Sequence, residues 1–106
     1  MPVPRRYREK LAAAVYALAV REGDVRERLR GAYFYLRMLS PQDVPLAHRD
    51  EFTSIMSALI KRGAEIGPNG ETFVRAIDNT MRNMRNSTGR RIAERIYSLN
   101  SLARDR

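Results

Sequence analysis

The stretch FTSIMSALI, residues 52–60, decides the fold class of this chain. Its large apolar residues recur at i, i+3, i+4, i+7 and i+8 and so share one face of an α-helix: Phe52, Ile55, Met56, Leu59 and Ile60. Pro45 has the fixed φ of a first helical turn, and Gly63 is a suitable residue to end a helix. We therefore expect an amphipathic helix between Pro45 and Gly63, and the flanking segments show weaker versions of the same pattern.

The chain before this stretch predicts two more helices. The first opens at Pro4 and ends near Gly23, and the second starts at Asp24, whose carboxylate can accept hydrogen bonds from free backbone amides. Glu27 follows Asp24 by three residues and completes a capping box. Residues 40–45 contain two prolines, which disfavour a continuous helix, so we expect a tight connection there with one helical turn at its start.

The chain after this stretch predicts a turn and two further helices. Residues 67–70 read Gly-Pro-Asn-Gly, which is a strong turn signal. We expect a fourth helix from near Glu71 and a fifth after a short break at residues 86–89. The expected core positions of these two helices are Phe73, Val74, Ile77, Met81, Met84, Ile92, Ile96, Leu99 and Ala103. No run alternates with a period of two for long enough to predict a strand.

The expected fold is therefore all-α, a compact bundle of four to five short helices. Residues 11–106 form this single helical-bundle domain, and residues 1–10 are a basic N-terminal arm or the first helical turn. The chain has no apolar run near the ~20 residues that a membrane span needs, so no membrane partner is expected. It has no cysteine, which excludes disulfides and thiolate metal sites and fits a cytoplasmic protein.

The net charge of +8 lies at the two ends of the sequence. Residues 1–10 carry +3, residues 75–106 carry +5, and residues 11–74 hold equal numbers of acids and bases. Segregated positive charge creates a local field that attracts a polyanion, whereas mixed charge largely cancels. Eighteen of the 20 basic residues are arginine. This preference reflects either codon usage or phosphate recognition, because a guanidinium can bind phosphate through two parallel hydrogen bonds.

The charge distribution predicts a non-enzymatic module that binds nucleic acid, either DNA or RNA, mainly through phosphates. The candidate contacts on the last two helices are Arg75, Arg82, Arg90, Arg91 and Arg95, and those at the N-terminus are Arg5, Arg6 and Arg8. We expect these two sets to gather into one positive surface once the chain folds. Tyr7 lies among the N-terminal arginines and either packs on its own helix or stacks on a base.

The alternative prediction is a protein-interaction module, either an adaptor subunit or a small inhibitor of a larger bacterial or phage complex. Its candidate interface residues are Tyr33, Phe34 and Tyr35, because aromatic side chains are enriched at protein interfaces. An acidic protein surface would attract the same arginines as a phosphate backbone. The expected core is small for its number of helices, so a homo-oligomer and a subunit of a larger complex both stay open.

A third alternative is an enzyme centred on His48, but the spacing of the residues around it does not support catalysis, a metal site or a cofactor. His48 is the single histidine, and the chain offers it neither a cysteine nor a second histidine with which to bind a metal. Asp50 and Glu51, which follow it, are typical first-turn acids that complement a helix dipole. We therefore expect no catalytic residue, no bound metal and no cofactor.

Overall fold

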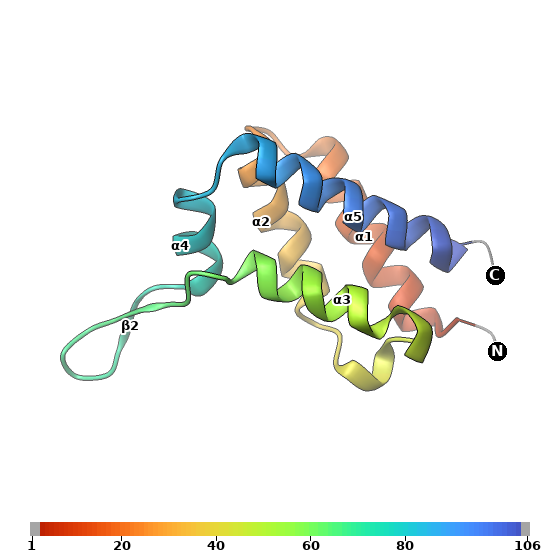
Figure 1. Cartoon of the computed structure of the whole chain (residues 1–106), viewed down its shortest axis with the longest axis horizontal. Coiled ribbons are helices and arrows are strands. Elements are labelled where there is room, and N and C mark those ends of the chain that lie inside the picture. The colour runs from red at the N-terminus through yellow and green to blue at the C-terminus, as the bar shows by residue number, and fades with distance from the viewer. Residues whose placement is uncertain (1–2, 105–106) are drawn as a thin grey trace.

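The structure is a computed structural model that describes residues 3–104, and within them five α-helices form a bundle from which a small hairpin projects (Figure 1). In chain order the elements are α1 (Arg5–Val20), α2 (Val25–Leu36), a short 3-10 helix (Pro41–Asp43), α3 (Leu46–Leu59), β1 (Glu65–Ile66), β2 (Thr72–Val74), α4 (Ala76–Arg82) and α5 (Asn86–Arg104). The all-α fold class expected from the sequence is confirmed.

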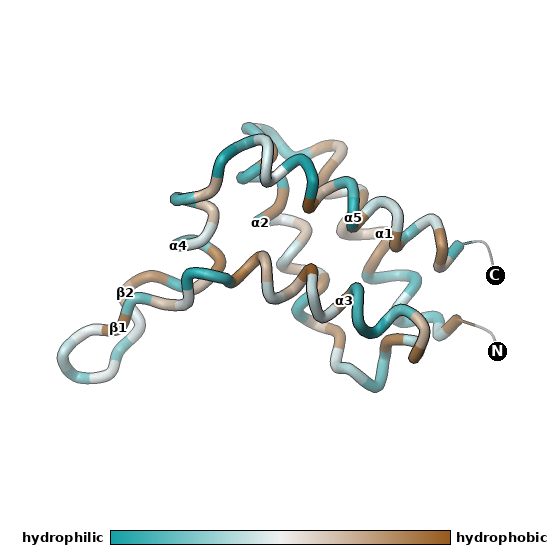
Figure 2. The backbone as a smooth tube through the Cα atoms, in the orientation of Figure 1, coloured by the Kyte–Doolittle hydropathy of each residue, from teal (hydrophilic) through white to brown (hydrophobic). Residues whose placement is uncertain are grey.

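The core lies between the four longer helices. α1 packs on α2 and α5, and α3 packs on α5. The largest fully buried side chains come from all four helices and from the connection before α3, namely Tyr7, Leu11, Leu29, Leu36, Val44, Ile55, Leu59 and Ile96. Figure 2 shows these helices as mixed brown and teal tubes, as expected of helices with one apolar face. Of the stretch at residues 52–60, Phe52, Ile55 and Leu59 are buried, while Ile60 follows the end of α3 and is exposed.

The expected starts of the first three helices are confirmed, but the expected capping box at Asp24 is not, because the Glu27 carboxylate accepts a hydrogen bond from Arg30 instead. The Asp24 carboxylate accepts hydrogen bonds from the backbone amides of Arg26 at 2.9 Å and Glu27 at 3.4 Å, so it caps α2. Pro45 directly precedes α3. The connection at residues 40–45 contains one turn of 3-10 helix, which Ser40 and Asp43 close with a capping box.

The expectation that the chain has no strand is wrong at residues 65–74. The turn at residues 67–70 joins β1 to β2 in an antiparallel hairpin, and Gly70 adopts a φ of +85° there, which favours glycine. Glu65 pairs with Val74 and Ile66 with Thr72, so Phe73 is the extra residue of a β-bulge. α4 consequently begins at Ala76, not near Glu71, and the side chain of Phe73 is 67% exposed instead of buried.

The break between the last two helices also differs from its expected position. α4 ends at Arg82 and α5 already begins at Asn86, so the break covers residues 83–85 and residues 86–89 are helical. Gly89 lies inside α5, where a Cβ atom would come within 2.9 Å of Cγ1 of Val25. The glycine therefore allows α5 to approach α2 closely and does not end a helix.

The two ends of the described chain lie together, and the hairpin and α4 lie at the opposite end of a long axis of 48 Å (Figure 1). α1 begins at Arg5, so residues 5–10 are helical turns, while residues 1 and 2 lie outside the described range. None of the helices within residues 3–104 is both long and apolar enough to cross a membrane.

Candidate nucleic-acid interface

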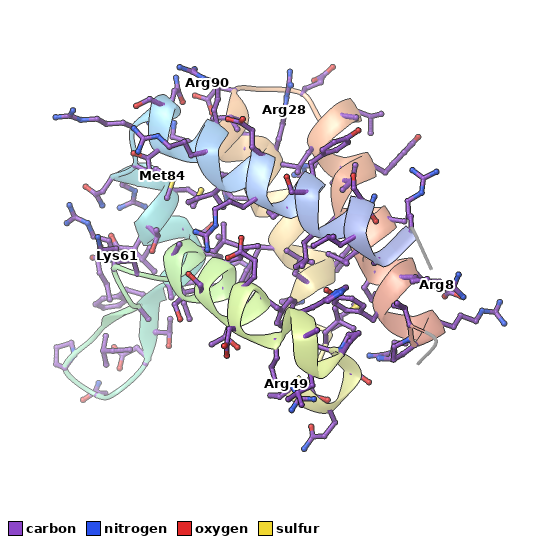
Figure 3. All side chains as sticks on the ribbon, turned by 45° about the vertical axis from the view of Figure 1, so that its right-hand side comes forward. Arg8, Arg28, Arg49, Lys61, Met84 and Arg90 are labelled. Carbon is purple, nitrogen blue, oxygen red and sulfur yellow. The ribbon has the colours of Figure 1, made fainter. Side chains whose placement is uncertain are left out.

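The two predicted sets of arginines do not share one surface. Arg5, Arg6 and Arg8 lie at the start of α1, near the chain termini, whereas α4 and the start of α5 lie at the other end of the molecule (Figure 1). Figure 3 shows Arg8 and Arg90 on opposite sides of the bundle. The expectation of a single positive surface made by both ends of the chain is therefore wrong. The reason is that α1 and α5 run antiparallel, which separates their N-terminal ends.

The N-terminal arginines are partly engaged with other groups of the protein. Nε of Arg5 lies 2.6 Å from Oε1 of Glu9, one helical turn away. Arg6 donates to the carbonyl oxygen of Met38 at 2.8 Å and lies 3.5 Å from the carboxylate of Asp43. Arg8 is exposed and makes no ion pair within residues 3–104. This set therefore presents less available charge than the sequence suggests.

Tyr7 is a core residue and cannot stack on a nucleic-acid base. Its side chain is fully buried, and its hydroxyl group is hydrogen-bonded to Nδ1 of His48 at 3.0 Å. Burial raises the pKa of Tyr7 far above its ordinary value, so the phenol keeps its proton. The ring also packs edge-on against Phe52, which joins the first turns of α1 to α3. His48 is thus a packing partner of Tyr7 at the crossing of two helices.

Two of the predicted C-terminal contacts are also ion-paired. Nε of Arg75 lies 2.9 Å from the carboxylate of Asp78. Arg95 makes a bidentate pair with Glu51, at 2.8 and 3.0 Å, and donates a further hydrogen bond to Ser54. The hydrogen bonds from Arg95 hold the pKa of Glu51 below its ordinary value. Arg95 therefore joins α5 to α3, a structural role that the sequence did not reveal.

A pocket of about 420 Å³ lies where α3 ends and the link between α4 and α5 passes it. We call it the basic pocket, and its lining residues are Lys61, Arg62, Thr80, Asn83, Met84, Arg85 and Thr88. It is lined by three cations, an amide and two hydroxyl groups, and by no carboxylate. Lys61 and Met84 lie on the same side of the molecule in Figure 3. This combination of groups is suited to bind phosphate oxygens.

The walls of the basic pocket are held by two hydrogen bonds between the turn after α3 and α4, and by one at the end of α4 itself. The backbone amide of Arg62 donates to Oγ1 of Thr80 at 3.0 Å, and Nδ2 of Asn79 donates to the carbonyl oxygen of Gly63 at 3.1 Å. Nδ2 of Asn83 donates to the carbonyl oxygen of Asn79 at 2.8 Å. These contacts fix the backbone on which the cations stand and involve none of the cationic groups.

The charge of the basic pocket is not compensated nearby. Lys61, Arg62 and Arg85 are exposed and make no ion pair in the part of the chain that the structure describes. Residues 79–93 contain four arginines and no acid, and the first turn of α5 has no acidic residue. Figure 2 shows much of the link into α5 in teal. Positive charge at a helix N-terminus opposes the helix dipole, so a bound anion would relieve this repulsion.

Of the remaining predicted arginines, one lies next to this pocket and two line other surfaces. Arg91 follows Thr88 by three residues and precedes Arg95 by four, so it lies on the side of α5 that faces α3, next to the basic pocket. Arg82 lines a groove on the opposite side of α4, and Arg90 lines a pocket together with Arg28 and Asp24. All three are exposed and make no ion pair within residues 3–104.

The sequence interpretation missed Lys61, Arg62 and Arg85. Lys61 and Arg62 lie in residues 11–74, a segment whose net charge is zero because it contains as many acids as bases. A signal was available, because Lys61 and Arg62 are adjacent cations between the end of an apolar helical face and Gly63. The acid-free run of residues 79–93 likewise marks Arg85 more clearly than the total charge of the C-terminal block does.

Within residues 3–104 no group of three histidine, cysteine, aspartate or glutamate side chains could hold a metal ion. Comparison of the chain with protein-family models, curated proteins and solved structures gives no match.

Proposed function

We propose that this protein binds nucleic acid through its phosphates at the basic pocket, with Lys61, Arg62, Arg85 and Arg91 as the cationic contacts. The observation that carries the proposal is a set of four exposed cations, none of them ion-paired within residues 3–104. Two follow the end of α3, one lies in the link before α5, and Arg91 lies on α5 itself. A phosphate backbone is a line of closely spaced anions, so it can satisfy several of these cations at once. Asn83 and Thr88 supply neutral groups for the same phosphate oxygens.

The proposed contacts therefore differ from the arginines that the sequence predicted. Arg91 stays in the proposed contact set, and Arg82 and Arg90 extend positive charge around the ends of α4 and α5. Arg75 and Arg95 are assigned to ion pairs with Asp78 and Glu51. Arg5, Arg6 and Arg8 lie at the start of α1, at the other end of the molecule from α4 and the start of α5 (Figure 1), and are not assigned to this site.

A salt titration tests this proposal. On duplex DNA the slope of log K against log salt is about −0.9 for each phosphate that a cation neutralises. The double substitution Arg85→Ala with Arg91→Ala should therefore make the slope about 1.8 less steep and weaken binding. The matched control is Arg5→Ala with Arg8→Ala, which removes the same two charges from the other end of the molecule. Equal losses in the two double variants would assign binding to net charge alone and contradict the proposed site.

A protein partner with an acidic surface is the second candidate, and the observation that favours it is the exposed ring of Phe34. The guanidinium of Arg37 lies 4.9 Å from the centre of this ring, and Tyr35 packs edge-on against it. Tyr33 and Tyr35 themselves are half-buried against the core. Copurification with a protein but without nucleic acid, and loss of that protein on Phe34→Ala, would favour this candidate.

A further inference from the structure

A second concave surface lies on the other side of α4 from the basic pocket. It is a groove of about 560 Å³ between the hairpin, the start of α2 and α4. α4 contributes Asp78, Met81 and Arg82 to the groove, whereas Thr80 and Asn83 line the basic pocket. Because Arg82 and Asn83 are neighbours in the chain, the C-terminal end of α4 is the boundary between the two concave surfaces.

Phe73 gives this groove an exposed aromatic ring. Its side chain is 67% exposed although it is a large apolar group, and it is the extra residue of the β-bulge in β2. The ring packs on the hairpin turn, since a Cβ atom on Gly67 would lie 2.9 Å from Cε2 of Phe73. The hairpin therefore supports the ring from one side and leaves most of it open to solvent. A bulge of this kind changes the direction of a side chain.

The charges of the groove are largely paired with one another. Asp24 lies 2.8 Å from Arg26, and Glu27 lies 2.8 Å from Arg30. Asp78 is in contact with both Arg30, at 2.7 Å, and Arg75, at 2.9 Å. Each of the three carboxylates that line the groove is thus neutralised, and the remaining arginine, Arg82, makes no ion pair within residues 3–104.

We infer that this groove takes an unpaired base of single-stranded nucleic acid, with the base stacked on Phe73 and its neighbouring phosphate bound by Arg82. The inference rests on the proposed function, because the strand would reach the groove from the basic pocket across the end of α4. The groove is lined by a flat apolar ring and by one available cation. This combination matches a nucleotide, which joins a flat base to a phosphate. Stacking on an exposed aromatic side chain accepts any base, because every base has a π-face.

The same geometry selects single strands over duplexes. In a duplex both faces of a base are covered by its neighbours, so a ring on the protein surface can stack only on a base that has left the helix. The basic pocket needs only phosphates, which duplex and single strand both supply. We therefore expect the two parts of the site to respond differently to the two kinds of nucleic acid.

Two variants of Phe73 test the inference. Phe73→Leu keeps an apolar side chain but removes the π-face, and it should weaken binding of an end-labelled oligo(dT) single strand about 10-fold while leaving a duplex of the same length unchanged. The matched control is Tyr16→Leu, because Tyr16 is also 67% exposed but lies on α1, away from the groove. This control should leave both affinities unchanged.

Phe73→Trp supplies a direct readout, since the chain contains no tryptophan. The indole should keep or increase the affinity for the single strand, and its fluorescence should be quenched as oligo(dT) saturates the protein. Saturation with duplex should leave the emission unchanged. This variant stays informative even if Phe73→Leu alters the hairpin, and circular dichroism of both variants reports whether the helices are retained.

The outcomes separate the inference from the proposed function. The inference is overturned if wild type and Phe73→Leu bind the single strand equally well, or if the Trp emission is not quenched at saturation. In either case the basic pocket remains the site. If the protein binds neither the single strand nor the duplex, both the inference and the proposed function are overturned. A change of Trp emission with an acidic polypeptide such as poly-glutamate, but not with oligo(dT), assigns the groove to a protein partner and also overturns the inference.

Discussion

The start of α1 and the basic pocket are both arginine-rich, but they differ in which groups the fold brings next to the arginines. At the start of α1, Arg5 faces Glu9 on the same helix, and Arg6 reaches Asp43 and the carbonyl oxygen of Met38. Around the basic pocket the fold brings three segments together, and none of them contributes a carboxylate to its lining. The net charge of a sequence segment therefore indicates the electrostatic field around it. It does not show which of its cations are unpaired and able to bind a ligand.

The difference extends to the role of the neighbouring side chains. Tyr7, in the middle of the N-terminal arginines, is fully buried and joins α1 to α3 through His48 and Phe52. Around the basic pocket the hydrogen bonds of Thr80 and Asn79 hold the backbone and leave the cations exposed. The first region contributes to folding and the second presents charge to solvent.

The N-terminal region should be essential for stability. Tyr7→Ala removes a fully buried aromatic ring and should lower the free energy of unfolding by about 3–5 kcal/mol, measured by urea denaturation. This loss is a large fraction of the total stability of a small domain, which is about 5–15 kcal/mol. At a temperature where the variant is folded, its affinity for nucleic acid should match that of the wild type. Loss of binding in a fully folded variant would contradict the division of roles.

The basic pocket should be essential for binding. Arg85→Glu with Arg91→Glu replaces attraction by repulsion at two contacts and should lower affinity for nucleic acid about 100-fold near 0.1 M salt. The same reversal at Arg5 and Arg8 should have a much smaller effect, because the start of α1 lies at the opposite end of the molecule (Figure 1). Fluorescence anisotropy with a labelled strand measures both. A larger loss in the N-terminal variant would move the site to the start of α1.

One acid placed in the basic pocket should separate stability from binding. Thr88 lies in the first turn of α5, which has no acidic residue. Thr88→Glu complements the helix dipole and the nearby cations, and it should raise the free energy of unfolding by about 0.3–1 kcal/mol. The same carboxylate competes with phosphate and should weaken binding about 10-fold. Thr88→Gln, which has the same shape without the charge, should show neither change. The decisive result is a higher free energy of unfolding together with a lower affinity for nucleic acid.

The sequence contains enough information to predict the helices and most of the core. Periodic apolar residues and caps such as Asp24 act over a few residues, so their effect can be derived locally. The hairpin was missed because its strands are only two and three residues long, too short for an alternating pattern. The turn at residues 67–70, followed by Thr72, Phe73 and Val74, is nevertheless typical of a hairpin. Because Phe73 was predicted to lie on a helix, it was also predicted to be a core residue. Its exposed position in the groove was therefore not expected.

The site could be predicted only in part, because pairing between arginines and acids depends on tertiary contacts. Arg75 and Asp78 are three residues apart, so their pairing on a helix could have been anticipated. Arg95 and Glu51 are 44 residues apart, and no local pattern predicts their contact. The basic pocket likewise joins Lys61 and Arg62 to Arg85 across a hairpin and a helix. Such clusters become visible only when the fold is known.

The smallest expected effect comes from releasing Arg95. Hydrogen bonds from Arg95 lower the pKa of Glu51 in the folded protein. The pair therefore stabilises the fold fully at pH values above the pKa of an unfolded glutamate, which is near 4.5. This stabilisation is lost as the pH falls through the lower pKa of the folded state. Both side chains are more than a third exposed, so solvent screening keeps the contribution at or below about 1 kcal/mol. Glu51→Gln should therefore lower stability slightly at pH 7 and flatten its decline below pH 4.5.

The same substitution should improve binding. Arg95 follows Thr88 and Arg91 along the side of α5 that faces α3, so an unpaired Arg95 would extend the row of available cations. Its release should make the salt dependence on duplex DNA steeper by up to about 0.9. Glu9→Gln is the matched control, because it frees Arg5 at the other end of the molecule. A steeper slope in Glu51→Gln but not in Glu9→Gln would show that availability next to the basic pocket, not total charge, decides binding.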